Sequence, residues 1–256
     1  MKNVFLLVLI ILFSIKSFGQ QKTIHVFVAL CDNKYQGIVP VPKQLGDGKD
    51  PKSNLYWGAL YGVKSYFKFK TKDWVLVEDF DSTEAPILNR ILFRHVTKDV
   101  YLLADAYDGE EIKTCIENFL ESSNSQKSVS ISIGSRVLQF GGNSDLITYV
   151  GHNGLMDFDV DVVYKKRVTQ QKDVMILACY SRHFFSNEIR AAGANPVLWT
   201  THLMAPEAYS LKSAIDGWMI NETGKQIQER AAQAYNKFQK CGIKGARNLF
   251  TSGFMN

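Results

Sequence analysis

Two reactive residues in the middle of the chain each follow a short apolar stretch. Residues 146–150 lead into Gly151 and His152, and residues 173–178 lead into Cys179. Short apolar runs bounded by turn residues are typical of buried strands. If the two strands are parallel neighbours, the imidazole and the thiol lie together at the carboxyl edge, where open α/β sheets place their sites.

A thiol and an imidazole at one sheet edge have the chemistry of nucleophilic catalysis. A thiol is mostly protonated at neutral pH, and an imidazole or a helix N-terminus makes it a better nucleophile by favouring the thiolate. His152 would act as the general acid/base, and a helix predicted after Cys179 would provide the second effect. Backbone N–H groups of Gly154 and Cys179 would form an oxyanion hole, because a glycine lets the substrate approach the backbone closely.

The elements that must position this pair alternate between strands and helices. Apolar runs predict strands at 24–30, 74–80, 100–106, 129–133, 146–150, 173–178 and 196–201. Apolar residues at helical spacing predict helices at 55–67, 82–92, 110–120, 183–192, 206–219 and 224–240. Period-two alternation at 155–163 predicts an exposed hairpin. The pattern predicts an α/β fold: a three-layer sandwich with a mostly parallel central sheet and helices on both faces.

The first residues of the chain have the pattern of a secretory signal. Lys2 precedes an apolar run at 4–15, and small residues follow up to Gly19. The run is shorter than the roughly 20 apolar residues of a spanning helix. We predict a signal peptide at 1–19, a secreted or periplasmic protein, and one α/β domain at 20–256 with no stable membrane insertion after cleavage. An uncleaved membrane anchor is the alternative.

Composition and charge narrow the classes of partner. The formal net charge is +5 at pH 7, and removing residues 1–19, which contain Lys2 and Lys16 and no acid, leaves +3. The basic residues are spread along the chain rather than clustered, so we expect no nucleic-acid partner. The 46% hydrophobic content suits a domain with a sizeable core.

The cysteines leave a second chemistry open. The chain has four of them, Cys31, Cys115, Cys179 and Cys241, and it is too large to need disulfides as a framework. Cys31 and Cys179 both end predicted strands, so a thiol redox protein that pairs them is one alternative. His183 shares a helical face with Cys179, but no further ligand follows at a fixed spacing. We therefore predict no metal and no cofactor.

The two strand ends resemble a known group of enzymes. An apolar strand ending in Gly-His-x-Gly, followed by one ending in Ala-Cys, resembles the caspase/metacaspase/gingipain group of cysteine peptidases. In this chain His152 precedes Cys179 by 27 residues, and this order and separation are similar to those of the group. The stretch at 54–60 is similar to the first helix of the group. The resemblance implies a caspase-like fold over about residues 24–203 and a cysteine endopeptidase that acts on peptides or proteins.

One departure from the family pattern bears on activity. The family has Gly directly after the histidine, whereas this chain has Asn153 and then Gly154. The second oxyanion donor is therefore Asn153, Gly154 or neither. The residues at 180–182 are also bulkier than the small residue that the group carries after the cysteine. A non-catalytic binding or scaffold protein of the same fold is therefore another alternative.

The resemblance also implies a charged pocket that selects the residue before the scissile bond. Asp32, Asp157 and Glu207 are the acids expected at the same sheet edge, and they would favour Arg or Lys by ion pairing in a desolvated pocket. Thr200, Thr201 and His202, at the end of the next strand, are expected as contacts at the rim.

Overall fold

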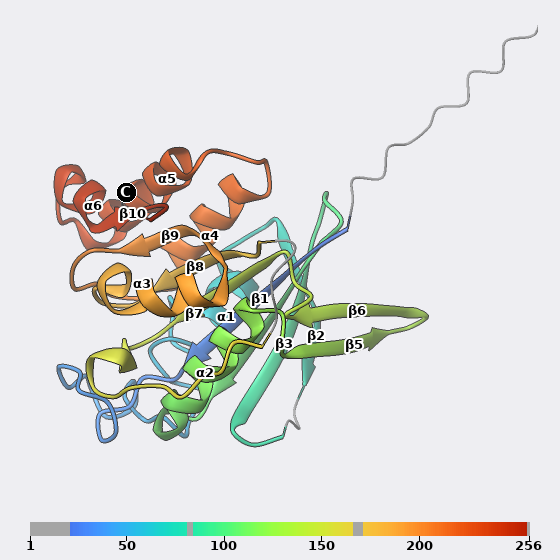
Figure 1. Cartoon of the computed structure of the whole chain (residues 1–256), viewed down its shortest axis with the longest axis horizontal. Helices are drawn as coiled ribbons and strands as arrows, with labels where there is room; N and C mark the ends of the chain where they lie inside the picture. The colour runs from blue at the N-terminus through green and yellow to red at the C-terminus, as the bar shows by residue number, and fades with distance from the viewer. Residues whose placement is uncertain (1–20, 81–83, 166–170, 255–256) are drawn as a thin grey trace, which may run out of the picture.

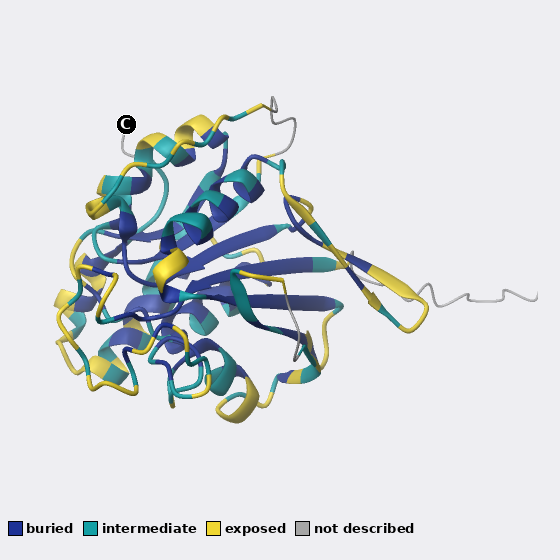
Figure 2. Ribbon diagram, turned by 90° about the horizontal axis from the view of Figure 1, so that it is seen from below, coloured by how far each residue is buried: buried dark blue, intermediate teal, exposed yellow. Residues whose placement is uncertain are grey.

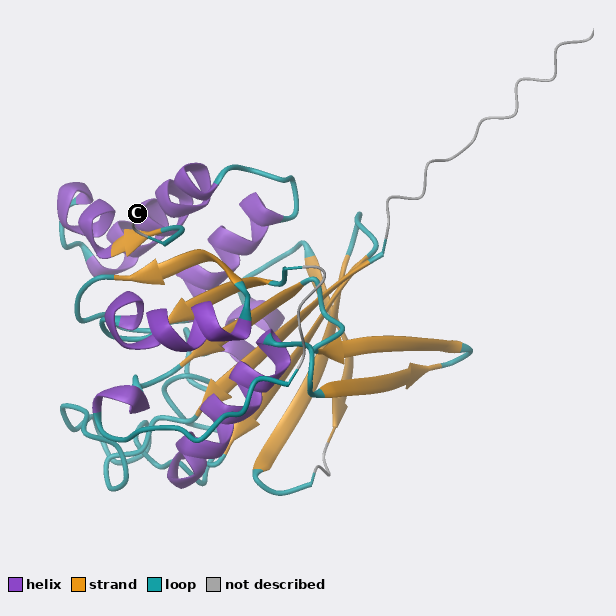
Figure 3. Cartoon of the chain, in the orientation of Figure 1, coloured by secondary structure: helices purple, strands orange, loops and turns teal. Residues whose placement is uncertain are grey.

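A central sheet with helices on both faces forms the body of the protein (Figures 1 and 3). The computed structural model describes residues 21–80, 84–165 and 171–254, so the predicted signal peptide at 1–19 lies outside the described residues. The predicted α/β three-layer sandwich is confirmed: eight strands, mostly parallel, make up the central sheet. No helix in the described ranges is long and apolar enough to cross a membrane.

The elements follow one another in a largely alternating order. The strands are β1 (Lys22–Ala29), β2 (Trp74–Phe80), β3 (Ile87–His95), β4 (Val100–Tyr107), β5 (Ser128–Ile133), β6 (Arg136–Gly141), β7 (Leu146–Val150), β8 (Asp173–Leu177), β9 (Asn195–Thr200) and β10 (Phe250–Thr251). The helices are α1 (Val63–Phe69), α2 (Ile112–Ser123), α3 (Ser181–Ala192), α4 (Ala208–Trp218), α5 (Gly224–Gln239) and α6 (Ile243–Leu249), with single 3₁₀ turns η1 (Gly109–Glu111) and η2 (Gly154–Met156).

The order of the strands brings the two reactive segments together. The central sheet runs β10-β9-β8-β7-β1-β4-β3-β2. Strands β9, β8, β7, β1 and β4 are parallel, whereas β3, β2 and β10 pair in antiparallel fashion. Because β7 and β8 are parallel neighbours with Val150 opposite Leu177, both chains leave the sheet at the same edge.

The core lies on both faces of the sheet because the central strands are mostly apolar and are buried at nearly every position. In β1, Val26 and Val28 pack in the cluster that contains α1, α4, α5 and α6. Phe27 and Ala29 face the opposite way, into the cluster that contains α2 and α3. Figure 2 shows these strands in dark blue between the helices. Continuous apolar strands of this kind are what a parallel sheet covered on both faces requires.

Three sequence predictions were wrong in detail, and in each case contacts distant in sequence decide the outcome. The helix predicted at 82–92 was wrong, because residues 87–92 belong to strand β3, which pairs with both β2 and β4 although its apolar residues have helical spacing; residues 82 and 83 lie outside the described residues. The helix predicted at 55–67 is confined to α1, after a series of turns. The hairpin predicted at 155–163 is η2 and an extended segment, whose Phe158, Val160 and Val162 pack against the cluster under α2 and α3.

A two-stranded sheet of β5 and β6 forms a hairpin that projects from the body (Figure 1). Its inner side chains, Ile131, Leu138 and Phe140, pack with Leu92 and Leu103 of the central sheet. The far end is exposed, as its yellow colour in Figure 2 shows. The sequence predicted one short strand at 129–133, whereas the structure has two paired strands, β5 and β6, in this region.

Candidate functional site

The backbone after β7 and β8 positions His152 and Cys179. Gly151 N–H donates to the Leu177 carbonyl at 3.2 Å, which ties the end of β7 to β8. Gly151 has φ +155°, and a Cβ there would lie 3.0 Å from the Ala29 carbonyl oxygen. A side chain at this position would therefore crowd β1, which explains why a glycine precedes the histidine.

The imidazole of His152 contacts the carboxylate of Asp157, because the chain turns back after the histidine. The 3₁₀ turn η2 reverses the backbone after Gly154, so that Asp157 Oδ2 lies 2.6 Å from His152 Nε2. The imidazole is 7% exposed and the Asp157 side chain 40% exposed. In the neutral tautomer that donates from Nε2 to the carboxylate, Nδ1 is the acceptor. In that tautomer, Nδ1 is the ring nitrogen that can accept a proton.

The thiol of Cys179 is half-buried and contacts the loop after β9. Met204 N–H donates to Cys179 Sγ at 3.3 Å, and the Met204 carbonyl lies 3.6 Å from the same sulfur. Burial raises the pKa of Cys179 above its ordinary value, and the Met204 N–H only partly offsets this. Because the thiol is protonated at neutral pH, it needs a base to become a nucleophile.

The turn between Cys179 and α3 has an unusual backbone. Tyr180 has φ 49° and ψ 30°, the left-handed conformation that non-glycine residues rarely adopt, and its N–H donates to the His202 carbonyl at 3.0 Å. Helix α3 begins at Ser181, two residues after the thiol. Residues held in such conformations concentrate at functional sites, where the surrounding structure maintains them.

His152 and Cys179 line one pocket of about 460 Å³. The walls come from the loop after β1, the segments around η2 and the loop between β9 and α4. The other lining residues are Gly37, Ile38, Val39, Val41, Leu55, Tyr56, Gly151, Met156, Leu203, Met204, Ala205, Pro206, Glu207 and Gln239. Among the described residues, the Cys179 thiol contacts Met204 and His152 Nε2 contacts Asp157. No hydrogen bond joins the thiol to the imidazole there.

The residues predicted for an oxyanion hole have distinct environments. Asn153 is fully buried: its Oδ1 accepts from Leu155 N–H at 3.2 Å and its Nδ2 donates to the Cys179 carbonyl at 2.6 Å. Gly154 is also buried, and a Cβ there would lie 2.4 Å from the Phe158 ring. Both residues lie outside the pocket lining, to which Cys179 contributes. Asn153 therefore fixes the loop, and Cys179 is the one residue among the predicted oxyanion donors that lines the pocket.

The predicted substrate-binding residues are dispersed by the structure. Asp32 is buried and accepts three backbone N–H groups, from Lys34, Tyr35 and Gly48, at 2.7, 3.0 and 3.1 Å. Its carboxylate therefore shapes the loop that follows β1. Of the predicted acids, Glu207 alone is among the described residues that line the pocket, and Asp157 contacts the imidazole instead.

The threonines and the histidine after β9 also lie outside the pocket lining. Thr200 is fully buried and hydrogen-bonds to Ala178 and Ser181. Thr201 Oγ1 donates to the Asn248 carbonyl at 2.6 Å, and His202 Nδ1 lies 2.7 Å from the same hydroxyl. The contact of Met204 with the Cys179 sulfur could not be predicted from the sequence, because Met204 lies in a loop without a periodic pattern.

The two thiols of the redox alternative, Cys31 and Cys179, differ in burial: Cys31 is buried and Cys179 is half-buried. All four cysteines are free thiols. Cys31 is fully buried, and burial raises its pKa to about 11. Burial therefore disfavours the thiolate form of Cys31, which is the form that takes part in thiol–disulfide exchange. The described ranges also contain no group of three or more His, Cys, Asp or Glu side chains arranged to hold a metal ion.

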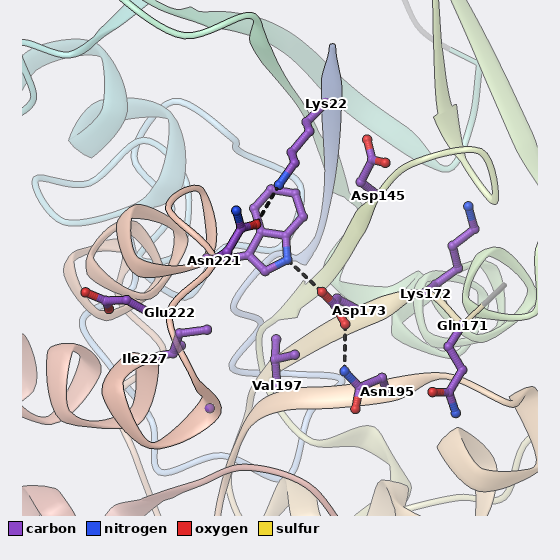
Figure 4. Close-up of a pocket in the computed structure, with 12 residues that line it drawn as sticks. Lys22, Asp145, Gln171, Lys172, Asp173, Asn195, Val197, Asn221, Glu222 and Ile227 are labelled. Carbon is purple, nitrogen blue, oxygen red and sulfur yellow. Dashed lines mark hydrogen bonds between the residues drawn. The ribbon is translucent and has the colours of Figure 1, made fainter. Parts of the chain in front are cut away.

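Two further cavities of similar size lie away from the thiol. One, of about 430 Å³, lies near the start of β8 and is polar (Figure 4). There Asp173 accepts from Trp218 Nε1 at 2.8 Å and from Asn195 Nδ2 at 2.7 Å, and Lys22 donates to Asn221 at 3.1 Å. The other, of about 440 Å³, borders Asp105 and its two partners, His25 and Arg90, each of which hydrogen-bonds to the Asp105 carboxylate. No cysteine is among the described residues that line either cavity.

Comparison with protein-family models, with curated proteins and with solved structures finds no match. The site must therefore be interpreted from its own geometry.

Proposed function

We propose that this protein is a cysteine endopeptidase of caspase-like fold, with Cys179 as nucleophile and His152 as general acid/base. The observation that carries the proposal is that both side chains, from the ends of neighbouring parallel strands, line one pocket. The contact of His152 Nε2 with Asp157 adds a third member that orients the imidazole. Secretion or a periplasmic location is part of the same proposal.

The proposed reaction uses the free ring nitrogen of His152. Cys179 Sγ attacks the carbonyl carbon of the scissile peptide bond, forming an S–C bond while its proton passes to Nδ1. The C–N bond then breaks, and the leaving amine takes the proton from Nδ1. Water then attacks the thioester carbonyl carbon while its proton passes to Nδ1. The C–S bond breaks, the carboxylic acid leaves, and the proton returns from Nδ1 to the sulfur to restore the thiol. Asp157 stabilises the imidazolium that forms in both halves of the reaction.

A non-catalytic peptide-binding protein is the second candidate, and one observation favours it. The Cys179 thiol contacts the Met204 backbone rather than the imidazole, and burial raises its pKa. For the peptidase, substrate must therefore displace the thiol from Met204 and bring it within reach of Nδ1. Apo enzymes often have long catalytic contacts that shorten only when substrate binds.

Labelling with a peptidyl chloromethyl ketone tests the proposal. Cys241 is exposed and would also react, so the experiment uses a Cys241→Ser background. We expect modification of Cys179, mapped by mass spectrometry, at a rate that falls at least a hundredfold in His152→Ala. Turnover of a peptide mixture by the unmodified protein, absent in Cys179→Ala, would accompany it.

The folded state of each variant is checked by circular dichroism, and His183→Ala serves as a matched histidine control. An undiminished labelling rate in folded His152→Ala would refute the dyad. Peptide binding without any turnover would favour the non-catalytic candidate instead.

A further inference from the structure

We infer that the pocket beside Cys179 accepts a large apolar side chain next to the scissile bond, such as Leu, Met or Phe. The inference rests on the proposed peptidase function, and it replaces the expected preference for Arg or Lys. It follows from the side chains that form the rim, the interior and the charge of the pocket.

The rim of the pocket exposes three large apolar side chains to water. Val39 is 87% exposed, Leu203 66% and Met156 41%. They come from three separate segments of the chain and line the same pocket as the thiol. Apolar side chains that gather around a concavity mark a surface that binds an apolar group.

The interior of the pocket continues this apolar surface. Ile38, Val41 and Leu55 are partly buried and pack against the core cluster that contains Cys31 and Tyr56. Met204 and Pro206 complete the wall beside the sulfur. Because these side chains rest on the core or on the loop bonded to Cys179, the apolar wall is positioned together with the nucleophile.

The charged groups that line the pocket disfavour both acidic and basic substrate side chains. No Lys or Arg is among its described lining residues, so an Asp or Glu side chain would be buried without a cation. Glu207 is the one carboxylate of the lining, and its Oε2 accepts from Tyr209 Oη at 2.8 Å and Gln239 Nε2 at 3.0 Å. A Lys side chain would leave water for apolar walls and a carboxylate that already has hydrogen-bond partners.

Binding to Cys179→Ala tests the inference without requiring catalysis. Short acetylated peptide amides that differ at one position, with Leu, Phe, Ala, Lys or Asp, are titrated by isothermal calorimetry. We expect the Leu and Phe peptides to bind about tenfold to hundredfold more tightly than the Ala peptide. The Lys and Asp peptides should bind more weakly than the Leu peptide.

Variants at the rim supply the control. Leu203→Asp and Val39→Asp, each made in Cys179→Ala, should weaken binding of the Leu peptide at least tenfold. Val137→Asp, on the exposed side of β6, replaces an equally accessible apolar side chain and should leave binding unchanged. Equal affinity for all peptides, no measurable binding, or tightest binding of the Lys peptide with its loss in Glu207→Gln would each overturn the inference.

The outcome is distinguishable from that of the proposed function. If Cys179 is not labelled but Cys179→Ala binds the Leu peptide selectively, the peptidase proposal fails and the apolar pocket stands. If labelling depends on His152 but the Lys peptide is preferred, the peptidase proposal stands and the inference about the substrate fails.

Discussion

Asn153 Nδ2 donates a hydrogen bond to the backbone carbonyl of Cys179 at 2.6 Å. The residue that interrupts the expected His-Gly pair thus links the two strand ends that carry the reactive side chains. Its Oδ1 also accepts from Leu155 N–H, which caps η2 and so directs the chain toward Asp157. One buried amide therefore fixes both the cysteine loop and the turn that supplies the partner of His152.

Asn153→Ala tests this link. The substitution removes the Asn153 partner of the Cys179 carbonyl and the cap of η2, so it should lower the free energy of unfolding by about 1–3 kcal/mol. Urea denaturation measures the change, and the labelling rate of Cys179 should fall with it. Asn143→Ala, at an exposed turn, is the control. Equal stability of the two variants would show that the bond contributes nothing.

The sequence predicted the sheet and the two reactive strand ends because both depend on local signals. Residues 146–150 and 174–178 are apolar except for Thr148, which is the pattern of a strand buried on both faces. The helix predicted at 82–92 was wrong because helical spacing and a strand buried by its neighbours can share a pattern in so short a segment. The role of Asp157 could not be predicted, since an acid five residues after a histidine faces it only when a tight turn intervenes.

Asp157→Asn should impair catalysis while the protein remains folded. The change removes the negative charge that stabilises the imidazolium and permits the wrong tautomer, so peptide turnover should fall on the order of tenfold or more. The variant to compare is Asp159→Asn, an exposed acid in the same segment. Steady-state kinetics on a fluorogenic peptide give the ratio. If both variants turn over substrate like the parent, Asp157 does not position His152.

Alkylation of Cys179 should depend on pH in a way set by its burial. Because burial raises the pKa of the thiol above its ordinary value, the thiolate fraction at pH 7 is lower than that of a free cysteine. The rate of alkylation by iodoacetamide should therefore be low at neutral pH. The midpoint of its increase with pH should lie at a higher pH than the midpoint for a model thiol. Stopped samples of the Cys241→Ser protein, analysed by mass spectrometry, give the profile. A midpoint below that of the model thiol would mean that the thiolate is already favoured at rest.

A cluster of charged and polar side chains on β1, β3 and β4 should contribute to the stability of the fold at acidic pH. Asp105 is fully buried and accepts from Arg90 Nε and Nη2 at 2.6 and 2.7 Å, with His25 Nε2 at 3.0 Å. Burial alone would raise the pKa of Asp105, but Arg90 and His25 outweigh it and hold the pKa below its ordinary value. A carboxyl with a lowered folded pKa stabilises the protein above its unfolded pKa of about 4, and this contribution is lost as the pH falls through the folded pKa.

Asp105→Asn separates this contribution from general acid unfolding. At neutral pH the variant leaves the partly buried Arg90 without its carboxylate partner, so the free energy of unfolding should fall by about 3 kcal/mol. Its stability should also fall less steeply than that of the parent as the pH drops below about 4, because it lacks the titrating group. Asp99→Asn, whose carboxylate lies 4.0 Å from Arg136 at the surface, should change stability by about 1 kcal/mol or less. Denaturation at a series of pH values measures both slopes, and parallel curves for the parent and Asp105→Asn would exclude Asp105 as the source of the acid dependence.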